Sequence, residues 1–340
     1  MLRNYIKNLI ADVLYRSGLA ALVVRWIFRS RMVVLTYHRV LPSAERESSF
    51  SHDAIMVEPD IFARHLSVLK RHFDCVTLDE FNAAIQSGEV SGKPKCLITF
   101  DDAWQDNYTH AFAHLKKEGT PAVVFVPTDY IGTEKLFWQE RLGHIVEQIC
   151  LQKPANAARL LRTYGWSHLA DRPPSLRRKE IKEVIRETKH KSYAEIDRIL
   201  DDLVCALDHI EPDYGPDRYL STEQMLEMMD FGISFQSHGC SHRVFPRLTA
   251  KELDEELRLS RLWLQEYLDT RPIALAYPNG DHDSDIQKET RQAGYALSFT
   301  TIPGCVDDAS DPSALRRINI NDGAAGTEAR LLMTLLLSGR

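Results

Sequence analysis

Short apolar runs alternate with helical patterns through most of this 340-residue chain. The run at 96–100 lies between Lys93-Pro94 and two aspartates, and the run at 122–126 follows a helical pattern that ends at Gly119. Apolar runs without polar alternation are typical of parallel strands that are buried on both faces. Further strands are predicted at 32–37, 233–237, 273–277, 296–300 and 317–320. About seven or eight strands with intervening helices indicate an α/β fold of right-handed βαβ units and favour a barrel over an open sheet.

The alternation stops between residues 134 and 220, where the sequence is helical and highly charged. Arg172-Pro173-Pro174 interrupts this stretch, and Pro212 and Pro216 mark its end. The prediction divides the chain into a basic amphipathic helical segment, the first part of the barrel, a helical insertion, the second part of the barrel and a C-terminal helix, at 1–31, 32–133, 134–220, 221–325 and 326–340.

The segment 1–31 carries six basic side chains against one acidic side chain, Asp12. Apolar residues recur there at helical spacing, and Trp26 lies among them. A basic amphipathic helix of this kind is typical of a segment that lies in the interface of a membrane. The other interpretation is a helix that packs its apolar stripe on the barrel. Charged residues interrupt the apolar stretch, so we expect neither a bilayer-spanning helix nor a secretory signal.

The charge and the cysteines limit the partners and the compartment. A formal net charge of −6 argues against nucleic acid as the main partner, because phosphate binding needs a concentrated basic face. The six cysteines are scattered, with no CxxC pair. In a chain of this length they indicate thiols in a reducing compartment. The expected location is the cytoplasm, with peripheral contact at the inner face of the membrane if 1–31 forms an interfacial helix.

Residues that can carry chemistry follow two of the predicted strands. Asp101 and Asp102 are adjacent carboxylates, which repel each other unless a cation or a helix N-terminus compensates them. One of them could instead cap the next helix. His238 and His242 follow the strand at 233–237, and neutral histidine is the commonest nitrogen ligand of zinc-type metals. The alternative is that these two histidines are unrelated.

A third strand ends at Tyr277, Pro278, Asn279 and Gly280, where a simple turn would also explain the Pro-Asn-Gly sequence. The carboxyl ends of the strands build the active site in β/α barrels. Together the three strand ends offer one carboxylate and two imidazoles for a metal, and a second carboxylate that is free to act as a base. This set is typical of a hydrolytic metal site with an open position for water.

In this order, the motifs resemble those of the NodB-homology polysaccharide deacetylases, carbohydrate esterase family 4. The resemblance rests on Thr99-Phe-Asp-Asp102, His238-x-x-x-His242 and Tyr277-Pro-Asn-Gly280. Leu35-Thr-Tyr-His-Arg-Val40 and the strand at 122–126 are similar to the subgroup found with bacterial exopolysaccharide and glycan assembly genes. The resemblance covers about 32–320, with the helical insertion outside the core motifs.

The resemblance implies a distorted (β/α)7 barrel that removes an N-acetyl group from an amino sugar. The substrate would be a polysaccharide, an oligosaccharide or a lipid-linked glycan. By position, Asp101 would be the general base, and Asp102, His238 and His242 would bind a divalent metal, with zinc expected first and cobalt second. The metal would polarise the acetyl carbonyl. A backbone N–H near Asn279 would help to hold the oxyanion, with the neighbouring Tyr277 and Pro278 at the substrate.

The chain departs from the family pattern at two of these motifs. Ala103 stands where the family has Gly after the two aspartates. The Arg that the family has just before Pro278, and that orients the base, is also missing. Arg316 or Arg317, at the start of the last predicted strand, could replace it. A pair of solvated arginines is the other interpretation.

The chain also departs from the family pattern in the motif that supplies the catalytic acid. The family's Leu-x-His near the C-terminus has no counterpart after His282, which itself lies in a predicted turn. His38 closes the strand at 32–37, so barrel geometry places it on the same face as Asp101 and His238. An unperturbed histidine suits a proton donor near neutral pH, and we predict that His38 is the acid. The alternative is a histidine that only hydrogen-bonds a metal ligand or its loop.

Two other functions compete with N-deacetylation of an N-acetylated glycan or lipid-linked sugar. A hydrolase of another small amide, such as a deformylase acting on a lipid-linked sugar, would need the same site. A catalytically silent glycan-binding barrel is suggested by the missing Arg and Leu-x-His. The complete set of two aspartates and two histidines argues against it, because a binding module has no need of a free carboxylate beside the metal.

Overall fold

The computed structural model describes residues 17–88, 92–152, 157–207 and 211–338. The chain divides into two compact units, each of which is described by itself. The barrel unit comprises Met1–Pro42, Asp53–Thr133 and Tyr219–Arg340. The helical unit comprises Ser43–His52 and Glu134–Arg218.

A parallel sheet forms the centre of the barrel unit. Its strands lie in the order β10-β1-β5-β6-β7-β8-β9, and β4 pairs with the start of β5. The strands of this sheet are β1 (Val33–Tyr37), β4 (Asp74–Cys75), β5 (Lys95–Phe100), β6 (Ala122–Val126), β7 (Ile233–Ser237), β8 (Ala274–Ala276), β9 (Leu297–Phe299) and β10 (Ile318–Asn319). A separate pair joins β2 (Arg39–Val40) to β3 (Met56–Val57).

The sheet curls until its two edges meet around the segment before β10. Leu315 forms a parallel bridge with Phe299 of β9, and three positions later Ile318 pairs with Leu35 of β1. One short segment therefore joins the last strand of the sheet to the first. This closure confirms the predicted α/β fold with a distorted β/α barrel.

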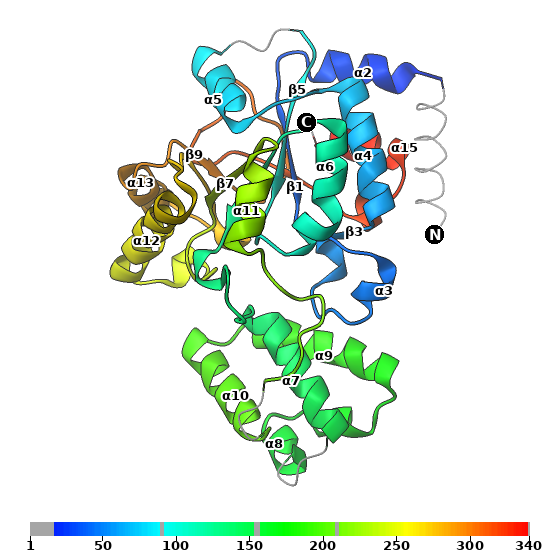
Figure 1. Cartoon of the computed structure of the whole chain (residues 1–340), viewed down its shortest axis with the longest axis vertical. Helices are drawn as coiled ribbons and strands as arrows, with labels where there is room; N and C mark the ends of the chain where they lie inside the picture. Colours follow the sequence, from blue (N-terminus) through cyan, green and yellow to red (C-terminus); the bar gives the residue numbers. More distant parts are fainter. Residues whose placement is uncertain (1–16, 89–91, 153–156, 208–210, 339–340) are drawn as a thin grey trace. The chain divides into compact units, whose positions relative to one another are not determined.

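Helices surround the sheet, with α4, α6 and α15 on one side and α12 and α13 on the other (Figure 1). The helices of this unit are α2 (Leu19–Ile27), α4 (Pro59–His72), α5 (Leu78–Ser87), α6 (Ala113–Glu118), α11 (Thr222–Met229), α12 (Ala250–Leu268), α13 (Ser284–Gln292), α14 (Asp322–Ala325) and α15 (Glu328–Ser338). Short 3-10 helices are η1 (Asp53–Ile55), η3 (Thr128–Tyr130), η5 (Phe245–Arg247) and η6 (Pro278–Gly280). The sequence predicts one helix at 106–118, whereas the structure has a π-helical turn, η2 (Asn107–Phe112), before α6.

Alternation along the strands decides which side chains enter the barrel. Apolar residues two positions apart, such as Val123 and Phe125 of β6, fill its interior. On β5, Leu97 lies in this interior cluster, and Thr99 is the next inward position because its hydroxyl lies 3.4 Å from that of Thr36 on β1. Because side chains on one face recur every second residue, the following inward position is Asp101, directly after β5. On β1, Thr36 is an inward position, so the next inward position is His38, directly after the carboxyl end of the strand.

The helix α2 has two different apolar faces. Val24 and Phe28 are buried, and the Phe28 ring contacts Phe73 edge to face with centroids 5.5 Å apart. On the opposite side Leu22 is 65% exposed and Trp26 is 68% exposed. The first sixteen residues of the predicted segment 1–31 lie outside the described residues. Within the described ranges, no helix is long and apolar enough to cross a membrane.

The helical unit contains α3 (Ser43–Arg46), α7 (Trp138–Gln152), α8 (Ala157–Thr163), η4 (Ser167–Asp171), α9 (Pro174–Thr188) and α10 (Tyr193–Cys205). Apolar faces of α7, α9 and α10 meet in one core that includes Leu142, Ile181 and Leu203. Residues 43–52, which the sequence prediction assigned to the first part of the barrel, pack with this unit.

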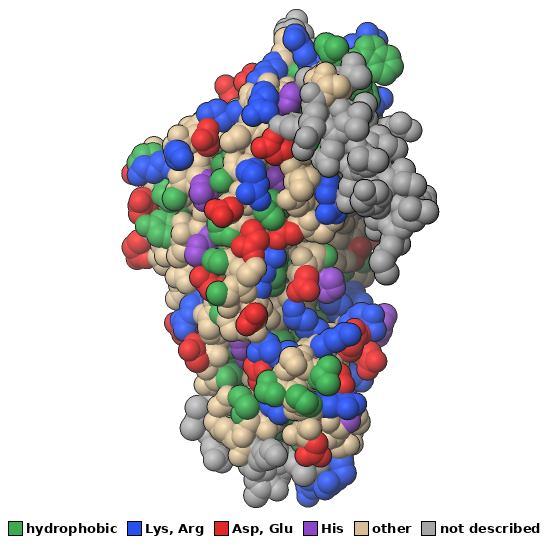
Figure 2. Space-filling model, turned by 90° about the vertical axis from the view of Figure 1, so that its right-hand side faces the viewer, with side chains coloured by type: hydrophobic (Ala, Val, Ile, Leu, Met, Phe, Trp, Pro, Cys, Tyr) green, Lys and Arg blue, Asp and Glu red, His purple; other side chains and the backbone are tan. Residues whose placement is uncertain are grey.

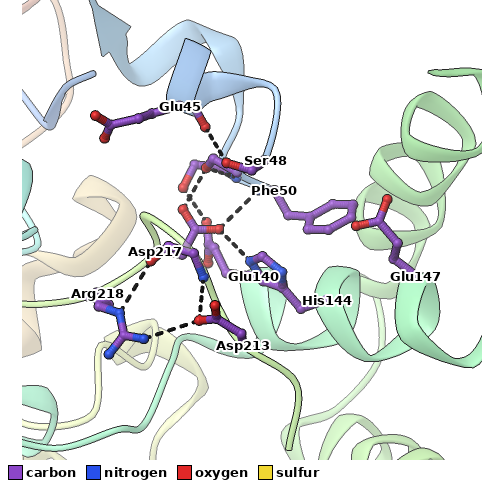
Figure 3. A network of polar contacts seen from close by, with 12 residues as sticks. Glu45, Ser48, Phe50, Glu140, His144, Glu147, Asp213, Asp217 and Arg218 are labelled. Carbon is purple, nitrogen blue, oxygen red and sulfur yellow. Dashed lines mark hydrogen bonds and ion pairs between the residues drawn. The ribbon is translucent and has the colours of Figure 1, made fainter. Parts of the chain in front are cut away.

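A buried carboxylate, Asp217, explains why that early segment joins the helical unit (Figure 3). Asp217 is 0% exposed, and its Oδ1 accepts a 2.6 Å hydrogen bond from Ser49 Oγ. Its Oδ2 accepts bonds from the Phe50 N–H at 3.1 Å and from His144 Nε2 at 2.8 Å. A buried charge without partners is costly, so these contacts fix the segment to α7.

Candidate active site

Three side chains at two strand ends of the barrel converge on one point. Asp102 follows β5, and His238 and His242 lie in the loop after β7. One ligand atom of each side chain lies within 4.8 Å of the corresponding atoms of the other two. Asp102 Oδ1 is 3.5 Å from His238 Nε2 and 3.2 Å from His242 Nε2. The structure therefore brings together the three residues predicted as metal ligands.

Backbone geometry turns Asp102 toward the histidines. The pleat that points Asp101 into the barrel would point Asp102 the other way. Asp102 and Ala103 have φ angles of 75° and 54°, and this left-handed turn redirects the chain directly after β5. Ala103 occupies the position where the family has Gly, so a residue with a Cβ adopts a conformation that favours glycine.

The donor set fits a divalent cation. Asp102 Oδ1 is buried and accepts no hydrogen bond, although the Nε2 atoms of His242 and His238 lie only 3.2 and 3.5 Å away. Burial alone would raise the pKa of the Asp102 carboxyl, but the charge of His242 and the contacts with both histidines hold that pKa well below its usual range. His238 Nδ1 is directed at the Ala276 carbonyl oxygen at 2.7 Å, which leaves Nε2 on the side of Asp102. An ionised carboxylate and two imidazoles are ligands that zinc accepts.

The second carboxylate, Asp101, is paired with Arg317 rather than with this trio. Arg317 Nη1 and Nη2 donate to Asp101 Oδ1 and Oδ2, both at 2.7 Å. Arg317 Nε donates to the Thr300 carbonyl oxygen at 2.8 Å, so the guanidinium is held on two sides. Burial would raise the pKa of Asp101, but the Arg317 charge outweighs it and the pKa is lowered. Of the two arginines that the sequence offered, Arg317 is therefore the buried partner of Asp101, and Arg316 is exposed.

His38 lies beside the same carboxylate. Its Nε2 is 3.9 Å from Asp101 Oδ2, and its side chain is largely buried. His38 Nδ1 is buried without a hydrogen-bond partner. The pKa of His38 is lowered, mainly by burial, against the opposing effect of Asp102 and Asp101. The structure therefore places this predicted acid next to Asp101, and its role as the acid stays a prediction.

The third motif is arranged differently from the other two. The Tyr277 ring is fully buried beside Phe245, and its hydroxyl donates to the Ser313 carbonyl oxygen at 2.9 Å. The ring therefore has no free surface to offer a substrate. Pro278 is buried in η6, whereas Asn279 is exposed, with a φ of 59° and a side chain bonded to Asp281. A role of the backbone near Asn279 in holding an oxyanion stays a prediction.

His282, the second candidate for the acid, stacks on the buried Tyr277 ring with centroids 4.9 Å apart. Its Nδ1 lies 2.9 Å from the Gly280 carbonyl oxygen. These contacts indicate that His282 packs against the turn that contains Gly280.

Sequence reasoning missed a buried glutamate that holds the histidine loop. Glu256 of α12 accepts hydrogen bonds from the backbone N–H groups of Cys240 and Ser241 and from the Ser241 hydroxyl. Glu256 lies on the buried side of α12, between Leu253 and Leu257. A charged residue on the apolar stripe of an amphipathic helix was the available signal.

Comparison with known proteins agrees with this arrangement. Residues 88–298 match the family model described as "Polysaccharide deacetylase". The chain is 28% identical over 299 residues to the Bacillus subtilis (strain 168) protein named "Putative polysaccharide deacetylase YxkH", which covers 88% of this chain and 74% of that protein.

Two solved structures share the fold. The Streptococcus pyogenes deacetylase PplD, in complex with acetate, has a TM-score of 0.59 and 20% identity, with coverage of 89% of this chain and 97% of that chain. IcaB from Ammonifex degensii has a TM-score of 0.57 and 20% identity, with the same coverage of both chains, 89% and 97%. Because the family model spans more than half of the sequence, this chain belongs to the polysaccharide deacetylase family and is a deacetylase hydrolase.

Proposed function

We propose that this protein is a metal-dependent hydrolase that removes N-acetyl groups from an amino sugar of a polysaccharide, an oligosaccharide or a lipid-linked glycan. One observation carries the proposal. The Asp102, His238 and His242 donor atoms face one another, beside a second carboxylate whose charge is balanced separately by Arg317. A site that only bound a glycan would gain nothing from this second, buried carboxylate.

Asp102, His238 and His242 would hold the cation, with zinc expected first and cobalt second. Three protein ligands of this kind leave a position open for water or substrate. When bound, the cation polarises the acetyl carbonyl and makes a water molecule more acidic. Asp101 lies outside the ligand set because both of its carboxylate oxygens accept hydrogen bonds from Arg317.

Asp101 would take the proton of the attacking water, because Arg317 keeps its carboxylate ionised and fixes its orientation. His38 would deliver a proton to the sugar nitrogen as the C–N bond breaks. The overall change consumes one water and releases one acetate and one amine. A backbone N–H near Asn279 would donate to the developing oxyanion.

The acyl group is proposed to be acetyl. The similar deacetylase PplD was solved in complex with acetate, which supports acetyl over formyl. Release of formate but not acetate from a panel of N-acyl glycans and lipid-linked sugars would instead identify a deformylase. A protein that binds these glycans and releases neither acid would be a silent binding barrel.

The metal assignment is tested by four variants of the same chain. Asp102→Ala, His238→Ala and His242→Ala should each lose metal, because each removes a ligand. Asp101→Asn should retain metal and lose turnover, because the amide removes only the proton acceptor. Elemental analysis of the purified variants measures this difference, and equal metal content in all four would refute the assigned roles.

His38 has its own test. His38→Ala should retain metal and lower kcat by roughly 10²–10⁴ if His38 is the acid. The matched control is His282→Ala, whose turnover should remain near that of the wild type. The reverse result would transfer the role of the acid to His282.

We also propose that the protein is cytoplasmic and touches the inner face of the membrane through α2. Leu22 and Trp26 are exposed on one side of this helix, and the exposed Arg25 and Arg29 flank them. Figure 2 shows apolar side chains beside basic ones at the top of the molecule, where α2 lies. Basic side chains around an exposed tryptophan and leucine suit an anionic lipid surface.

Liposome sedimentation tests this contact. The full chain should sediment with anionic vesicles, less so at high salt, because salt screens the arginines. Leu22→Ser/Trp26→Ser should abolish sedimentation, whereas Leu226→Ser on α11, which also removes an exposed leucine, should not. Absence of binding at low salt would refute the contact, and a dimer that the double variant dissociates would assign the surface to a second copy.

A further inference from the structure

The metal-binding carboxylate has a hydrogen-bond donor that the proposed mechanism does not use. Trp104 lies two residues after Asp102, and its indole Nε1–H donates to Asp102 Oδ2 at 3.1 Å. The Trp104 ring is only 1% exposed. Oδ2 is therefore occupied by a protein donor, while Oδ1 faces the two histidines without a hydrogen bond.

Ring stacking and backbone contacts hold the Trp104 indole in place. The Tyr219 ring stacks on it with centroids 4.7 Å apart and an interplanar angle of 20°. The backbones of these two residues form an antiparallel bridge, and the Leu220 N–H donates to the Ala103 carbonyl oxygen at 2.9 Å. These backbone contacts connect the left-handed turn at Asp102 and Ala103 to the segment that contains Tyr219, the residue that stacks on the indole.

A buried cation lies against the same ring. The Arg39 guanidinium carbon is 4.3 Å from the Trp104 ring centroid, and Arg39 is fully buried. Arg39 Nε donates to Asp106 Oδ2 at 2.8 Å, and Asp106 Oδ1 accepts from the Val40 N–H. A cation against an aromatic face draws electron density from the ring, which strengthens the N–H as a donor.

We propose that Trp104 is a positioning residue that makes Asp102 a ligand through one oxygen. By engaging Oδ2, the indole fixes the carboxylate rotamer and directs Oδ1 between His238 and His242. Without this hydrogen bond the carboxylate could rotate and bind the cation through both oxygens. The second oxygen would then occupy the position that is otherwise open for water or substrate. The proposal rests on the metal site proposed above.

Trp104→Phe tests it, because phenylalanine retains a ring for Tyr219 and Arg39 and removes the N–H. The affinity for Zn²⁺ and Co²⁺, measured by competition with a chromophoric chelator, should fall about 10- to 100-fold, the usual effect of losing such a contact. Trp166→Phe is the matched control, since Trp166 is a buried tryptophan in the core of the helical unit. The affinity of the Trp166→Phe variant for Zn²⁺ and Co²⁺ should be unchanged.

The outcomes separate this proposal from the proposed function. Absence of metal binding by the wild type would refute the metal site itself. Equal affinity in the wild type and Trp104→Phe, or a lower melting temperature with unchanged affinity, would overturn the role of Trp104 alone. A second measurement needs no variant: of the indole ¹⁵N–H signals of the five tryptophans, one should shift strongly when Zn²⁺ is added. If none shifts, the proposal is wrong even if Trp104→Phe does not fold.

Discussion

Arg317→Met should destabilise the barrel unit strongly, because it leaves a carboxylate buried without its counterion. Arg317 is 1% exposed and gives Asp101 two hydrogen bonds of 2.7 Å. Removing one partner of a buried ion pair typically costs about 3–5 kcal/mol of unfolding free energy. The Thr300 carbonyl oxygen also loses its bond from Nε. For a unit of this size the loss corresponds to a fall in melting temperature on the order of 10 °C.

The assay is thermal unfolding of metal-free protein in a chelator, so that metal binding does not contribute. Arg316→Met is the matched control, because the neighbouring Arg316 is exposed and its loss should cost less than about 0.5 kcal/mol. Combining Arg317→Met with Asp101→Leu should recover much of the loss, since an apolar pair can replace a buried ion pair. Equal melting temperatures for the Arg316 and Arg317 variants would refute the reasoning.

Three further predictions concern other buried contacts. Burial lowers the pKa of His65 to about 4, so below pH 6.5 the unfolded chain binds a proton that the native chain excludes. The unfolding free energy should therefore fall by up to about 3 kcal/mol between pH 6.5 and 4; urea titrations of His65→Gln should show a flatter dependence, and an unchanged slope would contradict this. Gly143→Ala would place a Cβ 2.3 Å from Phe50 Cγ, so overpacking of about 1–3 kcal/mol should exceed the helix-propensity gain of about 1 kcal/mol. Thermal unfolding should show a net loss that Phe50→Ala relieves, and a higher melting temperature for Gly143→Ala alone would be the opposite result. Asp217→Asn should speed hydrogen exchange of residues 43–52, because it weakens the bonds that hold this segment; unaltered protection would show that other contacts fix it.

The strands and the convergence of Asp102, His238 and His242 could be predicted from the sequence because both depend on local patterns. Buried parallel strands are nearly continuous apolar runs, and their carboxyl ends meet at one end of a barrel. Asp101 and Asp102 come directly after β5, His238 comes directly after β7, and His242 lies four residues further on, so their meeting point depends mainly on the order of the strands. The distances between them are set by the turns, above all the left-handed one at Asp102 and Ala103.

The partners of these residues could not be predicted in the same way. β10 has only two paired residues, which is too short for an alternation to show that Arg317 points inward and Arg316 outward. The packing of 43–52 with the helical unit depends on Asp217, which lies 168 positions after Ser49. Trp104 is typical of a core residue in its sequence context, and its bond to Asp102 depends on a turn that no short motif specifies.

The closure of the barrel also has a consequence in time. Arg317 is 216 positions after Asp101, and β1 is paired on one side by β10. At a synthesis rate of about 5–20 residues per second, Asp101 is synthesised roughly 10–40 s before its counterion. During that interval the nascent chain has an open sheet edge at β1 and an uncompensated carboxylate at the end of β5. Barrel closure and the pairing of Asp101 with Arg317 therefore both wait for the late segment that contains β10, and a chaperone that shields β1 and the end of β5 until then would protect the sheet edge and the carboxylate together.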